Sequence, residues 1–497
     1  MSTYNRRTFL TTGATLAAGI GLASTTTAGA TAGDADALLD PSIDPMPEMD
    51  EDWASYRGDP GHTRDVDATY EFDAGALDAA WSVDHDGSVA ITNGTVYTSS
   101  AEGVIAVDAA DGTVVWTNAD VEAANPAVIG ETVVLANQAG IVALDREDGR
   151  VRWERELAGD GEVSEHAVGY GGVYVVADGA LYALEIGDGS TRWARDSVTV
   201  TTPGSDEEYT FGFNRSPAAA NGVVYAATQR TVHAVEPTTG EDVWRDEEVY
   251  QDFAGPIHAN SNAVIVDWWS DVEQGVHDAQ TGELQELIWS ETRHETTLGE
   301  EIYVSGNNHS FFASAPEGDD PSWDVSSAYN AGQGVVCGDT VYVHFGDAEA
   351  EWSEYDEALV ALDKHDGSER WSLTTTDAPI GQIRAISDET LYVDHDGELV
   401  ALRESTSEDE TPNEDGDDNS SEDDENDSVG CSVDDADESA TDDSDGKGDG
   451  DDSVETSDVA SFPADGSPGF TTGAGLIGGA LGLEWLRRRA RTDESTE

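Results

Sequence analysis

Short apolar segments come in pairs through the middle of this chain, and residues that favour turns separate them. Asn93-Gly94 precedes the segment TVYTSS, and Asn221-Gly222 precedes VVYAAT. A second segment such as VIAVD, IVALD, LYALE or LVALD completes most pairs. Segments of this length, rich in β-branched and aromatic residues and bounded by Asn and Gly, are typical of β-strands. The sequence carries no helical amphipathic pattern of useful length, and it therefore predicts an all-β fold.

The second segment of most pairs leads to a glycine, and a tryptophan follows that glycine four or five residues later. The pairs are Gly112/Trp116, Gly149/Trp153, Gly189/Trp193, Gly240/Trp244, Gly318/Trp323 and Gly367/Trp371. With Gly282 included, successive glycines are 37, 40, 51, 42, 36 and 49 residues apart. A period near forty residues indicates a repeat architecture. The glycine supplies the positive φ of a short hairpin, and the flat indole suits the wedge between neighbouring sheets.

The number of strand pairs predicts the number of repeats. Pairs begin near Ala90, Ala127, Ala167, Pro217, Pro256, Thr297, Val335 and Ile386, which makes eight. The last unit, TLYVDHDGELVALRE, lacks a terminal tryptophan strand, whereas Trp81 stands in an orphan strand before the first unit. We predict an eight-bladed β-propeller of four-stranded antiparallel blades over residues 53–403, closed by this N-terminal strand. The structural residues between blades would be Trp81, Trp116, Trp153, Trp193, Trp244, Trp323 and Trp371.

The charge of the chain is strongly negative. It has 497 residues, with 23 Lys and Arg against 104 Asp and Glu, and a net charge of −81. Lys364 and Lys447 are its two lysines. This acidic excess with little lysine resembles proteins of extreme halophiles, and it argues against a nucleic-acid partner. Residues 404–466 are so acidic and so poor in large apolar side chains that we expect a disordered, extended stalk.

The two ends of the chain resemble export and sorting signals. Arg6 and Arg7 before Phe-Leu resemble a twin-arginine signal over residues 1–30, with cleavage after Ala30. Pro468, Gly469 and Phe470 begin a segment over 467–491 that resembles the PGF-CTERM sorting signal of archaeal surface proteins. That resemblance implies cleavage and attachment to a lipid, and an uncleaved membrane anchor is the alternative. We therefore expect an extracellular protein tethered at the cell surface.

Five Asn-x-Ser/Thr sequences mark possible glycosylation sites on an exported chain. They begin at Asn93, Asn214, Asn308, Asn419 and Asn426.

The repeat copies resemble the PQQ-like repeat of quinoprotein dehydrogenases and of the outer-membrane assembly lipoprotein. The residues that carry the resemblance are the DxxxGxxxW copies, and the segment from Trp53 to Thr63 resembles the lead-in of secreted PQQ-like propellers. The resemblance covers about residues 53–403, with degenerate copies near Gly282 and Gly318. For the dehydrogenases it implies a quinone held by an adjacent-cysteine disulfide, calcium ligands and a catalytic aspartate.

The candidate chemistry is sparse. Cys337 and Cys431 are 94 residues apart, so the adjacent-cysteine feature is missing, and no aspartate maps onto the catalytic motif. His258, His309 and His344 are candidates for the axial channel, and Trp268-Trp269 for a ligand platform. The alternative for each is an ordinary structural role.

We therefore predict a non-enzymatic, monomeric binding or scaffold module without cofactor or metal. Its partner would be a protein or glycan at the propeller loops or channel, and it would reach the membrane through its C-terminal anchor or lipid. A quinone- or metal-dependent oxidoreductase and a passive surface glycoprotein are the alternatives.

Overall fold

The computed structural model describes residues 39–47, 53–157, 163–201, 207–246, 256–267, 273–289, 296–315, 322–348 and 350–405. Every regular element in these ranges is a β-strand, which confirms the all-β prediction. Within the same ranges no helix is long and apolar enough to cross a membrane. The predicted stalk was placed to begin at Glu404, but Glu404 ends β35. Residues 406–466 of the stalk, the signal and sorting segments, and Cys431 with Trp268-Trp269 lie outside the described residues.

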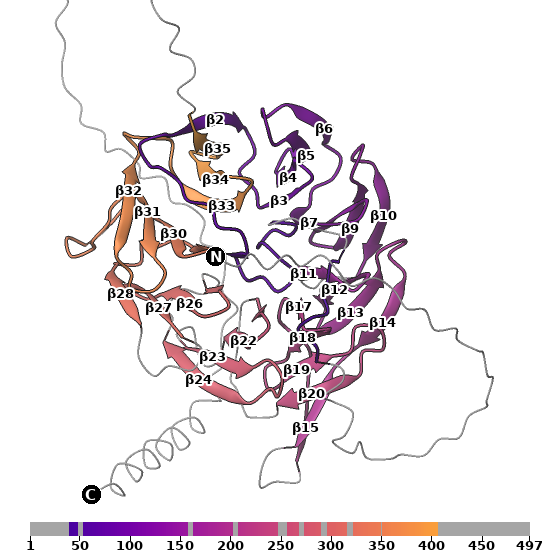
Figure 1. Ribbon diagram of the computed structural model, residues 1–497. Coiled ribbons are helices and arrows are strands. Elements are labelled where there is room, and N and C mark those ends of the chain that lie inside the picture. Colours follow the sequence, from indigo (N-terminus) through magenta and orange to yellow (C-terminus); the bar gives the residue numbers. More distant parts are fainter. Residues whose placement is uncertain are drawn as a thin grey trace, which may run out of the picture. The chain divides into compact units, whose positions relative to one another are not determined.

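Eight four-stranded blades form the ring, as the repeat count predicts (Figure 1). The first four blades comprise β3 (Val89–Thr92), β4 (Thr95–Ser100), β5 (Gly103–Asp108) and β6 (Val114–Asn118); β7 (Ala124–Ile129), β8 (Thr132–Ala136), β9 (Gly140–Asp145) and β10 (Val151–Glu156); β11 (Val163–Gly169), β12 (Gly172–Ala177), β13 (Ala180–Glu185) and β14 (Thr191–Arg195); and β17 (Ala218–Ala220), β18 (Val223–Ala227), β19 (Val232–Val235) and β20 (Asp242–Asp246).

The second half of the ring repeats this order. Its blades comprise β21 (His258–Ala259), β22 (Ala263–Asp267), β23 (Glu273–Asp278) and β24 (Leu284–Trp289); β25 (Thr297–Leu298), β26 (Tyr303–Gly306), β27 (Ser310–Ser314) and β28 (Trp323–Ser326); β29 (Val335–Cys337), β30 (Thr340–Phe345), β31 (Ala358–Asp363) and β32 (Glu369–Thr374); and β33 (Gln382–Ser387), β34 (Thr390–His395), β35 (Glu398–Glu404) and β2 (Leu77–Val83).

The ring closes through β2, as the orphan tryptophan strand predicts. β2 pairs antiparallel with β35, and Trp81 stands opposite Ala401. A strand that precedes the first blade in sequence thus supplies the outer strand of the last blade. Since this pairing joins the two ends of the propeller, no blade is left with a missing strand.

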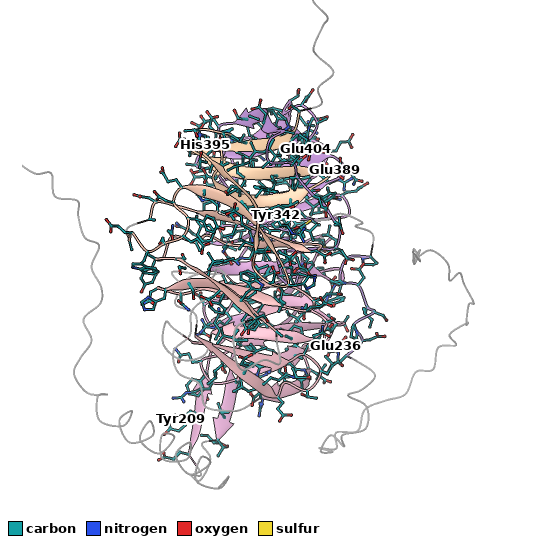
Figure 2. All side chains as sticks on the ribbon, turned by 60° about the vertical axis from the view of Figure 1, so that its left-hand side comes forward. Tyr209, Glu236, Tyr342, Glu389, His395 and Glu404 are labelled. Atoms are coloured by element: carbon teal, nitrogen blue, oxygen red, sulfur yellow. The ribbon has the colours of Figure 1, made fainter. Side chains whose placement is uncertain are left out.

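Two strand pairings were not predicted. β1 (Asp65–Val66) adds a fifth strand to the seventh blade, and it runs parallel to β29. A hairpin of β15 (Val198–Thr201) and β16 (Glu208–Phe211) is inserted between the third and fourth blades. Tyr209 on this hairpin is 48% exposed and lies away from the stacked blades (Figure 2).

The tryptophans join consecutive blades. The indole Nε1 of Trp116 donates to the carbonyl of Arg146 at 3.0 Å, and that of Trp153 donates to Ile186 at 2.9 Å. Each accepting residue belongs to the next blade, three positions before its hairpin glycine. Gly149 has a φ of 70°, and a Cβ there would lie 2.4 Å from the Trp116 ring. A glycine is therefore required both for its backbone and for the indole that packs on it.

The same bond recurs around the ring. The further pairs are Trp81 with Ala109, Trp193 with Pro237, Trp244 with Ala279 and Trp323 with Lys364. Trp371 departs from the rule: it packs on Tyr342, with ring centroids 5.8 Å apart, and the next blade has no equivalent hairpin because β2 completes it from elsewhere.

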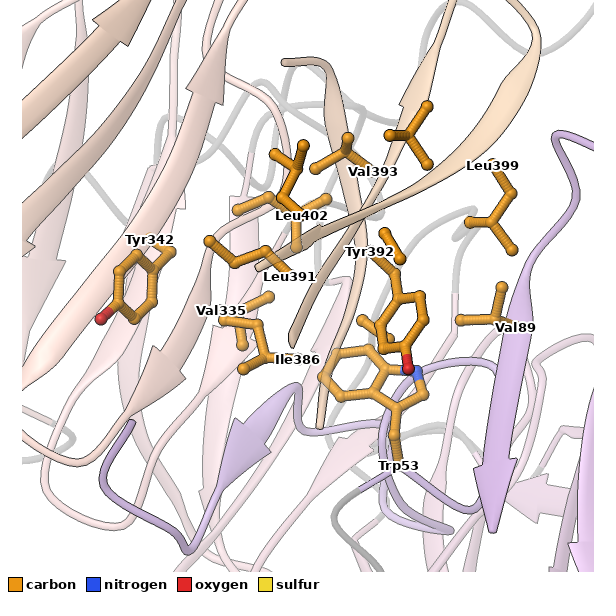
Figure 3. Close-up of a cluster of buried hydrophobic side chains, with 14 of the residues drawn as sticks. Trp53, Val89, Val335, Tyr342, Ile386, Leu391, Tyr392, Val393, Leu399 and Leu402 are labelled. Atoms are coloured by element: carbon orange, nitrogen blue, oxygen red, sulfur yellow. The ribbon is translucent and has the colours of Figure 1, made fainter. Parts of the chain in front are cut away.

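Apolar side chains fill the spaces between blades. The largest cluster joins the seventh, eighth and first blades through residues such as Tyr342, Leu391 and Val89. Trp53, which belongs to no blade, is fully buried in this cluster (Figure 3). The segment that carries Trp53 is therefore part of the core of the ring.

Candidate functional site

Residues 53–66, here called the axial segment, cross the inner edges of the blades. Their carbonyls accept hydrogen bonds from the innermost strands of six blades. The pairs are Ile91 with Trp53, Val128 with Ala54, Ala219 with Pro60, Ala259 with Gly61, Leu298 with Thr63 and Val336 with Arg64. These six donors occupy the equivalent position of their strands. The chain thus crosses the centre of its own ring (Figure 1), where the sequence had suggested a channel for a partner.

Local turns give the axial segment its path. Ser55 and Gly58 exchange backbone hydrogen bonds of 3.1 and 2.8 Å, and Gly58 has a φ of 93°. The Asp59 carboxylate then accepts from the Thr63 hydroxyl at 2.6 Å and from its backbone N–H at 3.1 Å. At Gly61 a Cβ would lie 2.1 Å from the Ala259 carbonyl oxygen, so the close approach to the fifth blade needs glycine.

Two histidines and a tyrosine are buried together: Tyr56 and His62 belong to the axial segment, and His166 lies in β11. The Tyr56 hydroxyl lies 3.1 Å from His62 Nε2, and the Tyr56 and His166 rings are 6.0 Å apart. His62 Nδ1 donates to the Ile257 carbonyl at 3.2 Å. Burial, with the Arg57 charge, lowers the pKa of His62 to about 3, and burial lowers the pKa of His166 to about 4. Both imidazoles are neutral at ordinary pH; His62 forms hydrogen bonds, and His166 packs against Tyr56.

The axial segment separates the two ends of the propeller axis. In each blade the innermost strand runs in the same sense, so its first residues gather at one end and its last residues at the other. Ala220, Asn260 and Glu300, which follow or end innermost strands, line a cavity of about 750 Å³. Ser88, Asn125 and Gln382, which precede or begin them, line a second cavity of about 540 Å³.

The first of these, the acidic cavity, is rich in carboxylates. Asp59, Asp65 and Asp67 of the segment or its continuation line it together with Glu300. Burial raises the pKa of Asp59. Burial, and then the neighbouring Asp59 charge, raises the pKa of Asp65 to about 7. Desolvated like charges disfavour ionisation at this end of the axis.

The second, the arginine cavity, has the opposite charge on the same segment. Arg57, Arg64 and Arg384 line it, together with the carboxylates Glu165 and Asp347. The Arg64 guanidinium lies over the Trp53 ring at 5.3 Å and donates to the carbonyls of Gly334 and Ile383 at 2.9 and 2.8 Å. Burial, and then the charges of Arg57 and Arg384, lowers the pKa of Arg64 to about 9. Three guanidiniums thus converge on one space.

The arginine cavity continues outward over the first three blades. A depression of about 1060 Å³, here called the outer groove, shares Ser88, Asn125, Glu165 and Arg384 with it. Asp86, Asp120 and Glu122 line the groove further out. Arginines and carboxylates thus lie together in the cavity, and carboxylates predominate in the groove.

The predicted histidines do not converge on one site. His258 is buried, and its Nδ1 donates to the His62 carbonyl at 2.8 Å. His344 Nδ1 lies 3.2 Å from Gln382 Nε2 beside the arginine cavity. His309 is exposed and packs near Trp352, with ring centroids 5.8 Å apart. Asn93 and Asn214 are exposed and Asn308 is half-buried, whereas Asn419 and Asn426 lie outside the described residues.

Sequence reasoning missed Arg57, Arg64 and Arg384. Arg57 stood within the motif from Trp53 to Thr63 that carried the family resemblance, and no site role was assigned to it. The available signal was the scarcity of basic residues. In a chain with so many carboxylates, each arginine is expected to have a structural partner or a functional role. Arg384 lies in β33, the first strand of the last blade. Only the folded ring brings it close to Arg57 and Arg64.

The described residues do not fit the quinone site that the dehydrogenase resemblance implies. The Cys337 thiol is buried and lies 3.2 Å from the Ala68 carbonyl, with no adjacent cysteine. Across the described ranges no group of three or more His, Cys, Asp or Glu side chains is arranged to hold a metal ion. The adjacent-cysteine and calcium set is therefore not assembled by these residues.

Solved structures share the ring. BamB from Moraxella catarrhalis is 18% identical, with a TM-score of 0.50 over 66% of this chain and 99% of that one. Quinohemoprotein alcohol dehydrogenase from Comamonas testosteroni is 13% identical, with a TM-score of 0.55 over 74% and 83%. The computationally designed Ika8 protein is 14% identical, with a TM-score of 0.51 over 66% and 99%. At these identities the likeness establishes the fold alone.

The sequence comparison agrees. No curated protein sequence matches the chain. A PQQ-repeat family model does, over residues 69–285 and 230–430, which together span most of the sequence. With the ring, its closing strand and the repeated tryptophan contacts in place, this match shows that the chain belongs to the PQQ-repeat family described as outer membrane protein assembly factor BamB.

Proposed function

We propose that this protein is a non-catalytic binding module, exported and tethered at the cell surface, that holds a protein or glycan partner. The observation that carries the proposal is the axial segment. It crosses the centre of the ring and lines an arginine cavity that shares residues with the outer groove. Such a surface offers shape and hydrogen bonds for recognition.

The absence of an assembled quinone and calcium set among the described residues supports binding over redox chemistry. A quinone in the presence of calcium, titrated into the purified protein and followed by absorbance, checks this choice. Saturable binding at one equivalent would favour the oxidoreductase.

The groove is tested by site-specific photo-crosslinking on living cells. Gln138 lines the outer groove and is exposed, so a photoreactive residue there should give discrete adducts with the partner. Asp188 is an exposed residue in the turn after β13 and provides the control position. Adducts at Asp188 alone, or at neither position, would contradict a partner in the groove.

Export and tethering rest on the sequence of the two chain ends. Replacing Arg6 and Arg7 by Lys should keep the protein inside the cell, because the paired arginines are the recognition feature of the twin-arginine signal. Cell fractionation measures this. Normal export of the doubly substituted chain would remove this part of the proposal.

A further inference from the structure

We propose that the arginine cavity binds a sugar acid, a compound that carries one carboxylate and several hydroxyl groups. This inference rests on the proposed binding function and names the ligand class of the same site. It follows from the hydrogen-bonding capacity, the charge balance and the aromatic rim of the cavity.

One guanidinium that lines the cavity has a donor that the fold does not use. Arg384 donates through Nη2 to Asp394 at 2.5 Å, whereas its buried Nε has no hydrogen-bond partner. Arg57 lines the same cavity and is 7% exposed. A planar carboxylate is the natural acceptor for such groups, because two parallel N–H···O bonds match its geometry.

The charge balance favours a monoanion. Three guanidiniums from Arg57, Arg64 and Arg384 face this cavity, but Glu165 and Asp347 also line it and Asp394 is paired with Arg384. Because the positive charge is largely balanced, a dianion such as phosphate would meet carboxylates as well as guanidiniums. Binding a single carboxylate requires less excess positive charge than binding a dianion.

Other contacts fit the rest of a sugar ring. Tyr329 lines the cavity with 61% of its surface exposed, and a flat aromatic face can cover the apolar face of a sugar. Gln382 also lines the cavity and supplies a carboxamide, whose Nε2 lies 3.2 Å from His344 Nδ1. The cavity volume of about 540 Å³ is in the range of small-molecule sites.

The outer groove limits where the carboxylate can be. Asp86, Asp120 and Glu122 would repel a chain charged along its length. A glycan would therefore place one terminal acidic sugar in the arginine cavity and extend neutral sugars along the groove. A free sugar acid would use the cavity alone.

The test is calorimetric titration of the full-length chain with glucuronate and with glucose, which has the same ring without the carboxylate. Glucuronate should bind at least about tenfold more tightly than glucose, since charge-assisted bonds to the guanidiniums are lost with the carboxylate. Equal binding of the two sugars, or tighter binding of inorganic phosphate, would overturn the proposal.

Variants locate the binding. Arg384→Gln should weaken glucuronate binding about tenfold, and Tyr329→Asn should weaken it several-fold. Asn suits the left-handed backbone of residue 329, whose φ is 60°, so this change spares the loop. Arg150→Gln is the matched control, because Arg150 is an exposed arginine paired with Asp148 on a hairpin. A similar loss in Arg150→Gln would contradict a site in the cavity.

Two further ligands distinguish the source of the sugar acid and the class of the partner. The first is an oligosaccharide of neutral sugars that ends in glucuronate. If it binds more tightly than free glucuronate, the site is assigned to the end of a glycan; if the two bind equally, it is assigned to the free acid. Both results support the proposal. An acidic peptide that binds in an Arg384-dependent manner while glucuronate does not would overturn the proposal and leave the binding module intact.

Discussion

The acidic and arginine cavities differ in charge although one short segment builds both. Asp59 and Asp65 face one end of the axis, and Arg57 and Arg64 face the other. At each end burial, and then neighbouring like charge, disfavours ionisation: the pKa of Asp65 is raised to about 7, and that of Arg64 is lowered to about 9. Both shifts oppose ionisation, so neither cluster forms because its charges attract one another. The backbone bonds of the axial segment hold them in place.

This comparison separates what builds the site from what it can bind. The six hydrogen bonds from the innermost strands fix the segment, and its turns decide which side chains face which end. The ligand preference of each end then follows from local charge, independently of the net charge of −81. A strongly acidic protein can thus offer an anion a place to bind.

The largest expected effect comes from moving the axial segment itself. Gly61→Ala should lower the free energy of unfolding by more than about 3 kcal/mol, because a Cβ would lie 2.1 Å from the Ala259 carbonyl oxygen. Thermal unfolding measures the loss. Gly187→Ala is the control, since no atom lies within 4 Å of a Cβ at that position. If Gly61→Ala and Gly187→Ala were equally stable, the close contact of the axial segment with the fifth blade would not contribute to the stability of the ring.

Acid should destabilise the region between the two ends. The unfolded histidines take up protons below about pH 6.5, whereas in the fold the pKa of His166 is about 4 and that of His62 about 3. The unfolded chain therefore binds more protons in this window, and stability falls as the pH drops through it. We expect a loss of about 2 kcal/mol or more from His62.

The contribution of His62 is isolated by comparing pH profiles of unfolding. His62→Gln should flatten the fall in stability between about pH 6 and 4. His365→Gln, a change at an exposed histidine, provides the control. An unchanged profile in His62→Gln would mean that the buried imidazole does not oppose protonation.

The acidic end should become more stable when one of its carboxylates is neutralised. The folded chain binds more protons at Asp65 than the unfolded chain between about pH 4 and 7, so the cost of this carboxylate grows as the pH rises and is complete above about pH 7. Asp65→Asn should add about 1 kcal/mol above pH 7 and almost nothing near pH 4. Asp67→Asn, at an exposed position, serves as control in denaturant unfolding. A destabilised Asp65→Asn would contradict the repulsion between Asp59 and Asp65.

The smallest effect on stability is expected at the arginine end. Arg384→Gln should change the free energy of unfolding by less than about 1 kcal/mol, because Arg384 and Asp394 form a partly exposed ion pair. The same unfolding assay measures it. A large loss would mean that Arg384 supports the ring, and its effect on ligand binding would then reflect misfolding.

Much of the fold follows from local pattern. The turn residues and paired apolar segments give the strands, and the spacing of glycine and tryptophan gives the repeat. Trp81 lies in a strand that belongs to no complete unit, and the last unit lacks a tryptophan strand. Together these two features predict how the ring closes. These features are predictable because most blades repeat one local solution, in which a hairpin glycine receives the indole of the blade before it.

The site depended on contacts that no local pattern records. Arg57, Arg64 and Arg384 line one cavity only because the segment from Trp53 to Val66 crosses the ring and β33 begins beside it. The sequence by itself determined the strands of the blades, the number of blades and the closing strand, since short-range periodicity and turn chemistry encode them. Only the tertiary structure decided that the chain occupies its own axis and that its charges divide between the two ends, because hydrogen bonds between distant residues set that path.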